Sequence, residues 1–292
     1  MTQTRLDERF FTMCITPVAE DNPNTALRDL SFLIREPFAE YHAKSRLHLT
    51  SHQLADFRRC PLLHHKKKLG LVPDVDRPAY LVGRALHTLV LEGRDVFERE
   101  YAVGGPINPK TGDFYGTTTK AYAEWAAAQG RPVLTIQQFD LIENMAEGVW
   151  AHEEAVELLS EGVAEGVVRS EYCGMPVQIR MDWYRSGPHE IVDLKSCDNL
   201  DYFEADARRY GYVHQLAFYR AVLRQATETM PSMHLLAVEK SEPFRSGVWR
   251  IDEDSLVQAQ KENEAAIERL KGCISSDHWP TGYEERRTFF AI

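Results

Sequence analysis

The sequence lacks long apolar runs and paired cysteines, and no leader segment is expected from its first residues. No stretch of its 292 residues approaches 18 consecutive apolar residues, so no transmembrane helix is expected. The first residues do not combine a basic flank with an apolar core, so no signal peptide is expected. The five cysteines are scattered, odd in number and without a CxxC pair. This pattern favours reduced thiols in the cytoplasm over a disulfide framework or a zinc site.

The chain also lacks an excess of basic residues, since its formal net charge is −10. This charge argues against a protein that coats nucleic acid through a broad basic surface, although basic residues lining one channel remain compatible with it. Basic side chains gather in residues 51–70, where Asp56 is the one acid. They are Arg58, Arg59, Lys66, Lys67 and Lys68. A solvated helix face and a DNA-binding face both explain such a run.

Residue patterns predict an arm at residues 1–45 and a single α/β domain at residues 46–292. The arm mixes charge, proline and asparagine, and is interpreted as loosely structured. Residues 102–117, rich in glycine, proline and asparagine, are expected to be a loop that meets substrate. Capping residues and apolar periodicity predict helices near 50–60, 80–91, 118–129, 135–161, 203–226 and 253–273. Alternating patterns predict an antiparallel meander over 167–173, 176–184 and 190–195, and further strands at 233–240 and 247–251.

Two of these predicted strands carry acids that a hairpin brings together. Residues 178–183 and 191–196 flank a turn-like segment, residues 184–190, with Ser-Gly-Pro at its centre, so Asp182 is expected beside Asp193. Asp193 and Lys195 are two residues apart and therefore point to the same face of a strand. Two carboxylates and an ammonium at one end of a sheet can hold a hard divalent cation and position a water. The sequence therefore predicts a metal-dependent phosphodiesterase site.

Two helices supply further polar residues in a recognisable order. Gln215 and Tyr219 are four residues apart and share one helix face, and His87 lies four residues after Gly83 on an apolar helix. The chain thus contains, in order, a Gly-x-x-x-His helix, a strand acid, an Asp-x-Lys strand and a Gln-x-x-x-Tyr helix. Because of this order, the chain from about residue 45 to 250 resembles the PD-(D/E)XK nuclease superfamily, specifically its RecB-like and exonuclease VIII (RecE)-like branch. The resemblance implies an α/β, restriction-endonuclease-like core: a mixed central sheet flanked by helices, with a helical N-terminal elaboration.

The resemblance also implies a role for each residue of the set. Mg²⁺, or Mn²⁺ in its place, is expected to bind oxygen ligands from Asp182 and Asp193. The backbone carbonyl of Leu194 and a nitrogen of His87 complete the expected ligands. Lys195 is expected to hold the attacking water, and Gln215 and Tyr219 to bind a phosphate or brace the lysine. An iron–sulfur cluster is not expected, because Cys60 matches a cluster position but Cys273 alone lies near the C-terminus.

Each of these residues also has an ordinary structural explanation. Either aspartate can cap a turn, Lys195 can be a surface lysine, and His87 can be a satisfied core residue. Gln215 and Tyr219 can simply pack their helix. Two other residues stay open: Arg84 can grip a phosphate through its planar fork, and Glu171 on the first strand either approaches the metal or faces solvent.

The function that the resemblance implies is a Mg²⁺-dependent DNA exonuclease of phage or prophage type in the bacterial cytoplasm. Such an enzyme digests the 5′ strand at the ends of double-stranded DNA and leaves a 3′ single strand for an annealing protein. A ring-shaped homo-oligomer threaded by DNA is expected, with residues 58–68 and Arg84 near the DNA path. The alternatives are an endonuclease or single-strand nuclease of the same fold, a non-catalytic DNA-end-binding subunit, and an unrelated α/β metal-binding protein.

Overall fold

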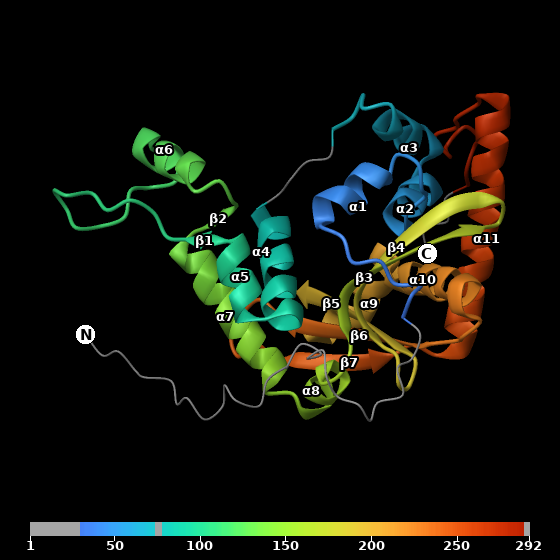
Figure 1. The fold of residues 1–292 in the computed structure, drawn as a ribbon. Coiled ribbons are helices and arrows are strands. Elements are labelled where there is room, and N and C mark those ends of the chain that lie inside the picture. Colours follow the sequence, from blue (N-terminus) through green and yellow to red (C-terminus); the bar gives the residue numbers. More distant parts are fainter. Residues whose placement is uncertain (1–29, 74–77, 289–292) are drawn as a thin grey trace.

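The computed structural model describes residues 30–73 and 78–288, and a five-stranded mixed sheet lies at its centre (Figure 1). The strand order across the sheet is β3–β4–β5–β6–β7. Strands β3, β4 and β5 form an antiparallel meander, β6 is parallel to β5, and β7 is antiparallel to β6. The strands span Val163–Tyr172, Met175–Arg185, Glu190–Cys197, Ser232–Glu239 and Ser246–Arg250. The predicted meander and both later strands are therefore confirmed.

Helices cover both faces of this sheet and bury two apolar clusters, which confirms the expected α/β fold class. One cluster joins the sheet to α2 (Ser51–Arg59), α9 (Phe203–Tyr210), α10 (Tyr212–Thr227) and α11 (Glu253–Ser276). The other joins it to α4 (Pro78–His87), the following π-helical turn η1 (Thr88–Glu92), α5 (Arg94–Glu100), α7 (Ile136–Trp150) and α8 (Glu153–Leu159). The sheet is thus the middle of three layers, and polar residues on it are enclosed unless a strand ends or distorts.

The structure divides two segments that the sequence predicts as continuous helices. Residues 135–161 form α7 and α8, because His152 leaves helical geometry and its Nδ1 accepts a hydrogen bond from the Ala155 amide as the cap of α8. Residues 203–226 form α9 and α10, because Gly211 has a φ of 74°. Left-handed geometry of this kind is accessible to glycine at little cost, so the chain turns between the two helices there.

The predicted loop at 102–117 begins with a short strand and leads into a projection. Strand β1 (Ala102–Val103) pairs in parallel with β2 (Val133–Leu134). Helix α6 (Lys120–Ala128) and the loop before it extend away from the body of the protein (Figure 1). In residues 30–73 and 78–288, none of the helices combines the length and apolar character needed to cross a membrane.

The described part of the expected arm, residues 30–45, lies against the sheet. Ile34 forms an isolated bridge with Val167 of β3, and helix α1 (Phe38–Lys44) follows. The buried amide of Gln178 on β4 donates a hydrogen bond of 2.9 Å to the carbonyl of Tyr41 on α1. Glu36 also forms an ion pair with Arg169 of β3. The remainder of the arm, residues 1–29, lies outside the described residues, and the boundary at residue 45 stays a prediction. Helix α3 (Pro61–Lys68) carries the rest of the basic run.

Candidate active site

Asp182 lies where strands β4 and β5 separate. The two strands pair from Arg185 and Glu190 at the turn up to Trp183 and Val192. The next pair in this register is Asp182 and Asp193, but there the ladder stops. Oδ2 of Asp182 instead accepts a hydrogen bond of 2.8 Å from the Leu194 amide. A side-chain carboxylate thus replaces a backbone acceptor, and the opening between the strands is lined with acids.

Asp193 and Lys195 of β5 form a buried ion pair, as their spacing predicts. The side chain of Asp193 is 0% exposed, and the Lys195 ammonium contacts its Oδ2. Burial raises the pKa of Asp193 to about 6; the Lys195 charge opposes this rise and the Asp182 charge adds to it. Burial alone disfavours the ammonium, but the two carboxylates raise the pKa of Lys195. Lys195 is therefore a cation at neutral pH and can donate hydrogen bonds rather than accept a proton.

Helix α10 supplies the polar residues that fix this ion pair. The amide nitrogen of Gln215 donates to Oδ1 of Asp193 at 3.1 Å and to the hydroxyl of Tyr219 at 3.0 Å. The ring of Tyr212 lies 5.0 Å from the Lys195 ammonium, close enough for a cation–π contact. Gln215 thus braces the acid of the pair directly, and Tyr219 contacts Gln215. The contact with the lysine comes from Tyr212, which the sequence did not single out.

His87 reaches the same opening from the opposite layer. It is the last residue of α4, and the chain continues into the π-helical turn η1, a distortion that is frequent at functional sites. Its Nε2 lies 2.9 Å from the Leu194 carbonyl oxygen, and its Nδ1 lies 3.6 Å from Oδ2 of Asp182. The structure thus brings His87 together with a backbone carbonyl and an acid that follow it by about one hundred residues.

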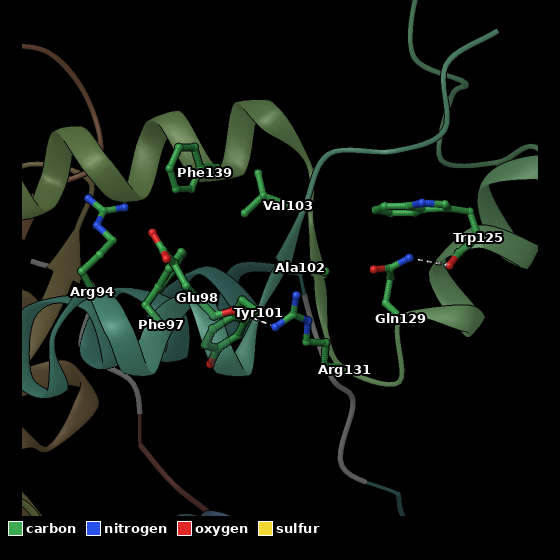
Figure 2. Close-up of a pocket in the computed structure, with 10 residues that line it drawn as sticks. All are labelled: Arg94, Phe97, Glu98, Tyr101, Ala102, Val103, Trp125, Gln129, Arg131 and Phe139. Atoms are coloured by element: carbon green, nitrogen blue, oxygen red, sulfur yellow. Dashed lines mark hydrogen bonds between the residues drawn. The ribbon is translucent and has the colours of Figure 1, made fainter. Parts of the chain in front are cut away.

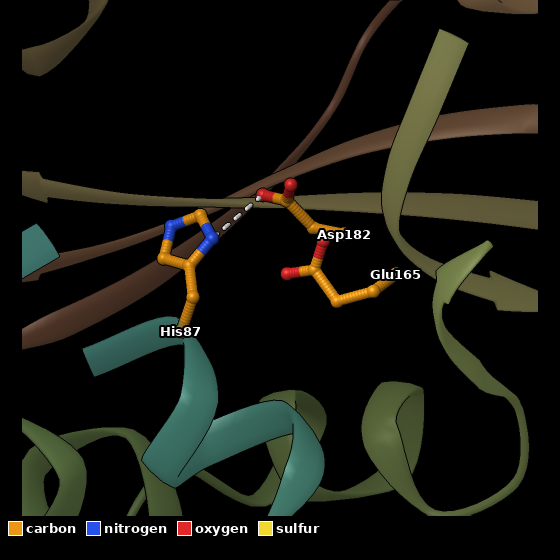
Figure 3. A group of neighbouring side chains, drawn as sticks. All are labelled: His87, Glu165 and Asp182. Atoms are coloured by element: carbon orange, nitrogen blue, oxygen red, sulfur yellow. Dashed lines mark ion pairs between the residues drawn. The ribbon is translucent and has the colours of Figure 1, made fainter. Parts of the chain in front are cut away.

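Glu165 of β3 is an acid of this site that the sequence did not indicate. Figure 3 shows its carboxylate turned toward His87 and Asp182, and one ligand atom from each of the three residues lies within 4.8 Å of the others. Burial raises the pKa of Glu165 to about 7, and the charge of Asp182 adds to this rise. The guanidinium of Arg180 on β4 forms an ion pair with Glu165 and partly offsets it.

The acid that the sequence singled out on this strand lies elsewhere. Glu171 is exposed and pairs with Pro176 near the opposite end of β3. The strand begins at Val163, whereas the sequence pattern predicted a start at residue 167, so Glu165 was not assigned to a strand. The hairpin register is the signal that could have identified Glu165. Tyr172 pairs with Met175 beside the turn, and following this antiparallel pairing back along both strands places Glu165 opposite Asp182.

The residues of the site fit a hard divalent cation. Carboxylate and carbonyl oxygens, with one imidazole nitrogen, are ligands that Mg²⁺ and Mn²⁺ accept. The Oδ2 atom of Asp193 contacts the Lys195 ammonium. Burial raises the pKa values of Asp193 and Glu165, and the charge of Asp182 adds to both rises, so a bound cation would relieve the repulsion among these carboxylates. The residues that would hold the ion are His87, Glu165, Asp182, Asp193 and the Leu194 carbonyl.

The candidate DNA-binding residues have varied surroundings. Arg84 lies one turn before His87 on α4, whereas Arg58 donates a hydrogen bond to Asn263 of α11. Lys67 forms an ion pair of 2.8 Å with Asp56. The side chains of Arg59, Lys66 and Lys68 are exposed. Arg58 and Lys67 thus have partners in the fold outside the acids of the site.

A separate cavity of about 340 Å³ lies between α5, α6 and α7 and shares no lining residue with the site (Figure 2). Four aromatic side chains and two cations contribute to its wall: Phe97, Tyr101, Trp125, Phe139, Arg94 and Arg131. Arg94 pairs with Glu143, and Arg131 donates to two backbone carbonyls. Both cations of the cavity wall thus have partners within the fold.

Comparisons with known proteins agree with this geometry. Residues 50–288 match a family model described as a PDDEXK-like domain of unknown function. A search among curated proteins gives no match. Twelve chains of solved structures match. One is a crystal structure from Eubacterium rectale, described by provisional assignment as an exonuclease; it is 17% identical, with a TM-score of 0.64, over 89% of this chain and 96% of that one. The chain belongs to this family of PDDEXK-like domains, and so to the PD-(D/E)XK nuclease superfamily.

Proposed function

We propose that the protein is a Mg²⁺-dependent deoxyribonuclease, with Mn²⁺ as a substitute ion, and that it acts as an exonuclease on double-stranded DNA ends. The observation that carries the proposal is the buried pair of Asp193 and Lys195 beside Asp182, at the point where two strands separate. A structural ion pair in a core needs no third acid. Here the added acid makes the metal-free site electrostatically costly, which is characteristic of a site built to bind a cation.

The chain's own residues divide the work of phosphodiester hydrolysis. A divalent cation, when bound, polarises the phosphate and lowers the pKa of a water. Lys195, held as an ammonium, donates a hydrogen bond to the attacking water and offsets the charge that develops on the phosphate. Gln215 fixes the carboxylate of Asp193 and thereby the position of the lysine. Tyr219 supports the Gln215 amide from within the helix layer.

The finer features of the proposal rest on the resemblance and on the exonuclease description of the similar structure. They are 5′-to-3′ polarity, release of a 3′ single strand for an annealing protein, and a ring-shaped homo-oligomer around the DNA. A ring offers one way to combine a net charge of −10 with DNA binding, because basic side chains can line its bore. Light scattering coupled to size exclusion tests the ring, which predicts a closed oligomer and no monomer.

A linear duplex labelled separately at its 5′ and 3′ ends tests the activity, with Mg²⁺ or EDTA and with a closed circle as control. We expect Mg²⁺-dependent loss of the 5′ label from linear DNA and an intact circle. Cutting of the circle identifies an endonuclease, and digestion restricted to single strands identifies a single-strand nuclease. Binding of DNA ends by the folded protein without cleavage identifies an end-binding subunit and contradicts the proposal.

A further inference from the structure

We infer that Glu165 is a third side-chain ligand of the divalent cation, beside His87 and Asp182, an inference that rests on the function proposed above. The three side chains come from β3, α4 and β4, and converge in one place (Figure 3). Their ligand atoms lie within 4.8 Å of one another, the range in which one ion can contact all three after small side-chain rotations. A carboxylate is the ligand type that Mg²⁺ and Mn²⁺ prefer.

The backbone at Glu165 is shaped to present its side chain to this place. The two-residue turn at Cys173 and Gly174 fixes the register of β3 against β4, with φ values of 51° and 69°. The ladder includes Ala164 and Gly166 but omits Glu165, whose own φ is 56°. A residue with a side chain adopts this left-handed geometry at a cost, and such residues concentrate at functional sites.

Strand β4 is distorted at the facing position. Residues two apart on a regular strand share a face. Met181, however, packs into the apolar cluster that contains α10, whereas Trp183 packs into the cluster that contains α4. The change of face falls at Asp182, opposite Glu165. Both acids therefore leave the regular pleat together, and their carboxylates turn toward His87.

Arg180 contacts one of the two oxygens of the Glu165 carboxylate. Its Nε contacts Oε2 of Glu165, and Phe38 of α1 covers the guanidinium at 5.2 Å from the ring centroid. A carboxylate has a second oxygen that can bind a cation while the first keeps this ion pair. Arg180 precedes Asp182 by two residues on β4, so the arginine and the neighbouring ligand come from one strand.

The charges around the site also favour a cation there. The Asp193 side chain is fully buried, and its Oδ2 contacts the Lys195 ammonium. At the other side of the site, Glu165 contacts the Arg180 guanidinium. Asp182 lies between these two ion pairs, with His87 as its neighbour. A cation beside His87 neutralises the middle.

Calorimetric titration of the metal-free protein with Mn²⁺ tests the inference independently of catalysis. We expect Glu165→Gln, which keeps the side-chain shape, to weaken Mn²⁺ binding at least about tenfold. This expectation follows the loss of metal affinity seen when even outer partners of ligands are removed. Glu171→Gln is the matched control, since it changes an exposed glutamate of the same strand, and should bind Mn²⁺ as the wild type does.

Binding by Glu165→Gln within twofold of the wild type overturns the inference, and continued Mg²⁺-dependent cleavage by the wild type then leaves the proposed function intact. A wild type that neither binds Mn²⁺ nor cleaves DNA removes both. If the glutamine variant does not fold, Glu165→Asp provides the test, because it keeps the charge but withdraws the carboxylate by one methylene. It should bind Mn²⁺ at least about threefold more weakly, and unchanged binding overturns the inference.

Discussion

Replacing Asp193 by asparagine should stabilise the metal-free protein while abolishing cleavage. Asparagine keeps the shape of the side chain and an oxygen that accepts the hydrogen bond from Gln215. It removes the negative charge of a side chain that is 0% exposed and lies near Asp182. Removing a paired residue from a core usually destabilises a fold, so a gain in stability is a distinctive outcome.

The size of the gain follows from the pKa of Asp193. Burial raises this pKa from 3.8 to about 6, a value that already includes the attraction of Lys195. By linkage, the ionised carboxylate therefore costs the folded state about 3 kcal/mol at neutral pH. Water around the partly exposed Lys195 reduces this cost, so we expect a net gain of about 1 kcal/mol, or about 2 °C in Tm for a chain of this size.

Thermal unfolding in EDTA at pH 7.5 and at pH 5 measures the effect. An acid with a raised folded-state pKa destabilises the fold above that pKa, and this cost disappears as pH falls through about 6 toward 3.8. The difference between variant and wild type should therefore shrink at pH 5. Glu171→Gln, at an exposed site, should show no difference at either pH. A Tm of Asp193→Asn that falls by 2 °C or more at pH 7.5 would refute the reasoning.

Three further predictions concern residues around the site. Lys195→Ala should reduce cleavage at least about a thousandfold in a labelled-duplex assay, but should retain Mn²⁺ binding by calorimetry; wild-type turnover would remove Lys195 from the mechanism. Gly83→Ala should raise Tm by about 2 °C, since a Cβ there meets nothing within 4 Å and alanine favours a helix by about 1 kcal/mol. The same methyl group should reduce cleavage if DNA uses this space beside His87. Glu36→Gln should lower the free energy of unfolding in urea by about 1–3 kcal/mol, because the Arg169 ion pair lowers the pKa of this acid; the loss should diminish as pH falls below 4.5 and through the lowered pKa.

Period-two geometry made one half of the site predictable. Asp193 and Lys195 had to share a face of β5, and the turn after β4 had to bring Asp182 alongside. These relations depend on residues a few positions apart, so the sequence contains them. The Gln215 amide was placed correctly on one helix face with Tyr219 for the same reason.

The other half depends on packing between distant segments. No local pattern places His87 against a strand that follows it by about one hundred residues, and the resemblance alone supplied this contact. Glu165 was missed because the apolar alternation of its strand becomes clear only after it, although the turn at Cys173 fixes its partner. The strands β1 and β2 have two residues each, too few for any periodicity.

The hydrogen bond from the Leu194 amide to Asp182 affects how an inactive protein for trapping DNA should be chosen. Nuclease crystallography commonly needs a variant that grips its substrate and leaves it whole. Asp182 is a poor position for that purpose, because its carboxylate also closes the gap between two strands, and its loss disturbs the backbone on which Lys195 sits. Among the described residues, the Lys195 side chain contacts the Asp193 carboxylate and the Tyr212 ring, and no hydrogen bond joins it to the backbone of the sheet. Lys195 is therefore the better position to substitute in an inactive variant for DNA-bound structures, because the acids and the opening between the strands are preserved.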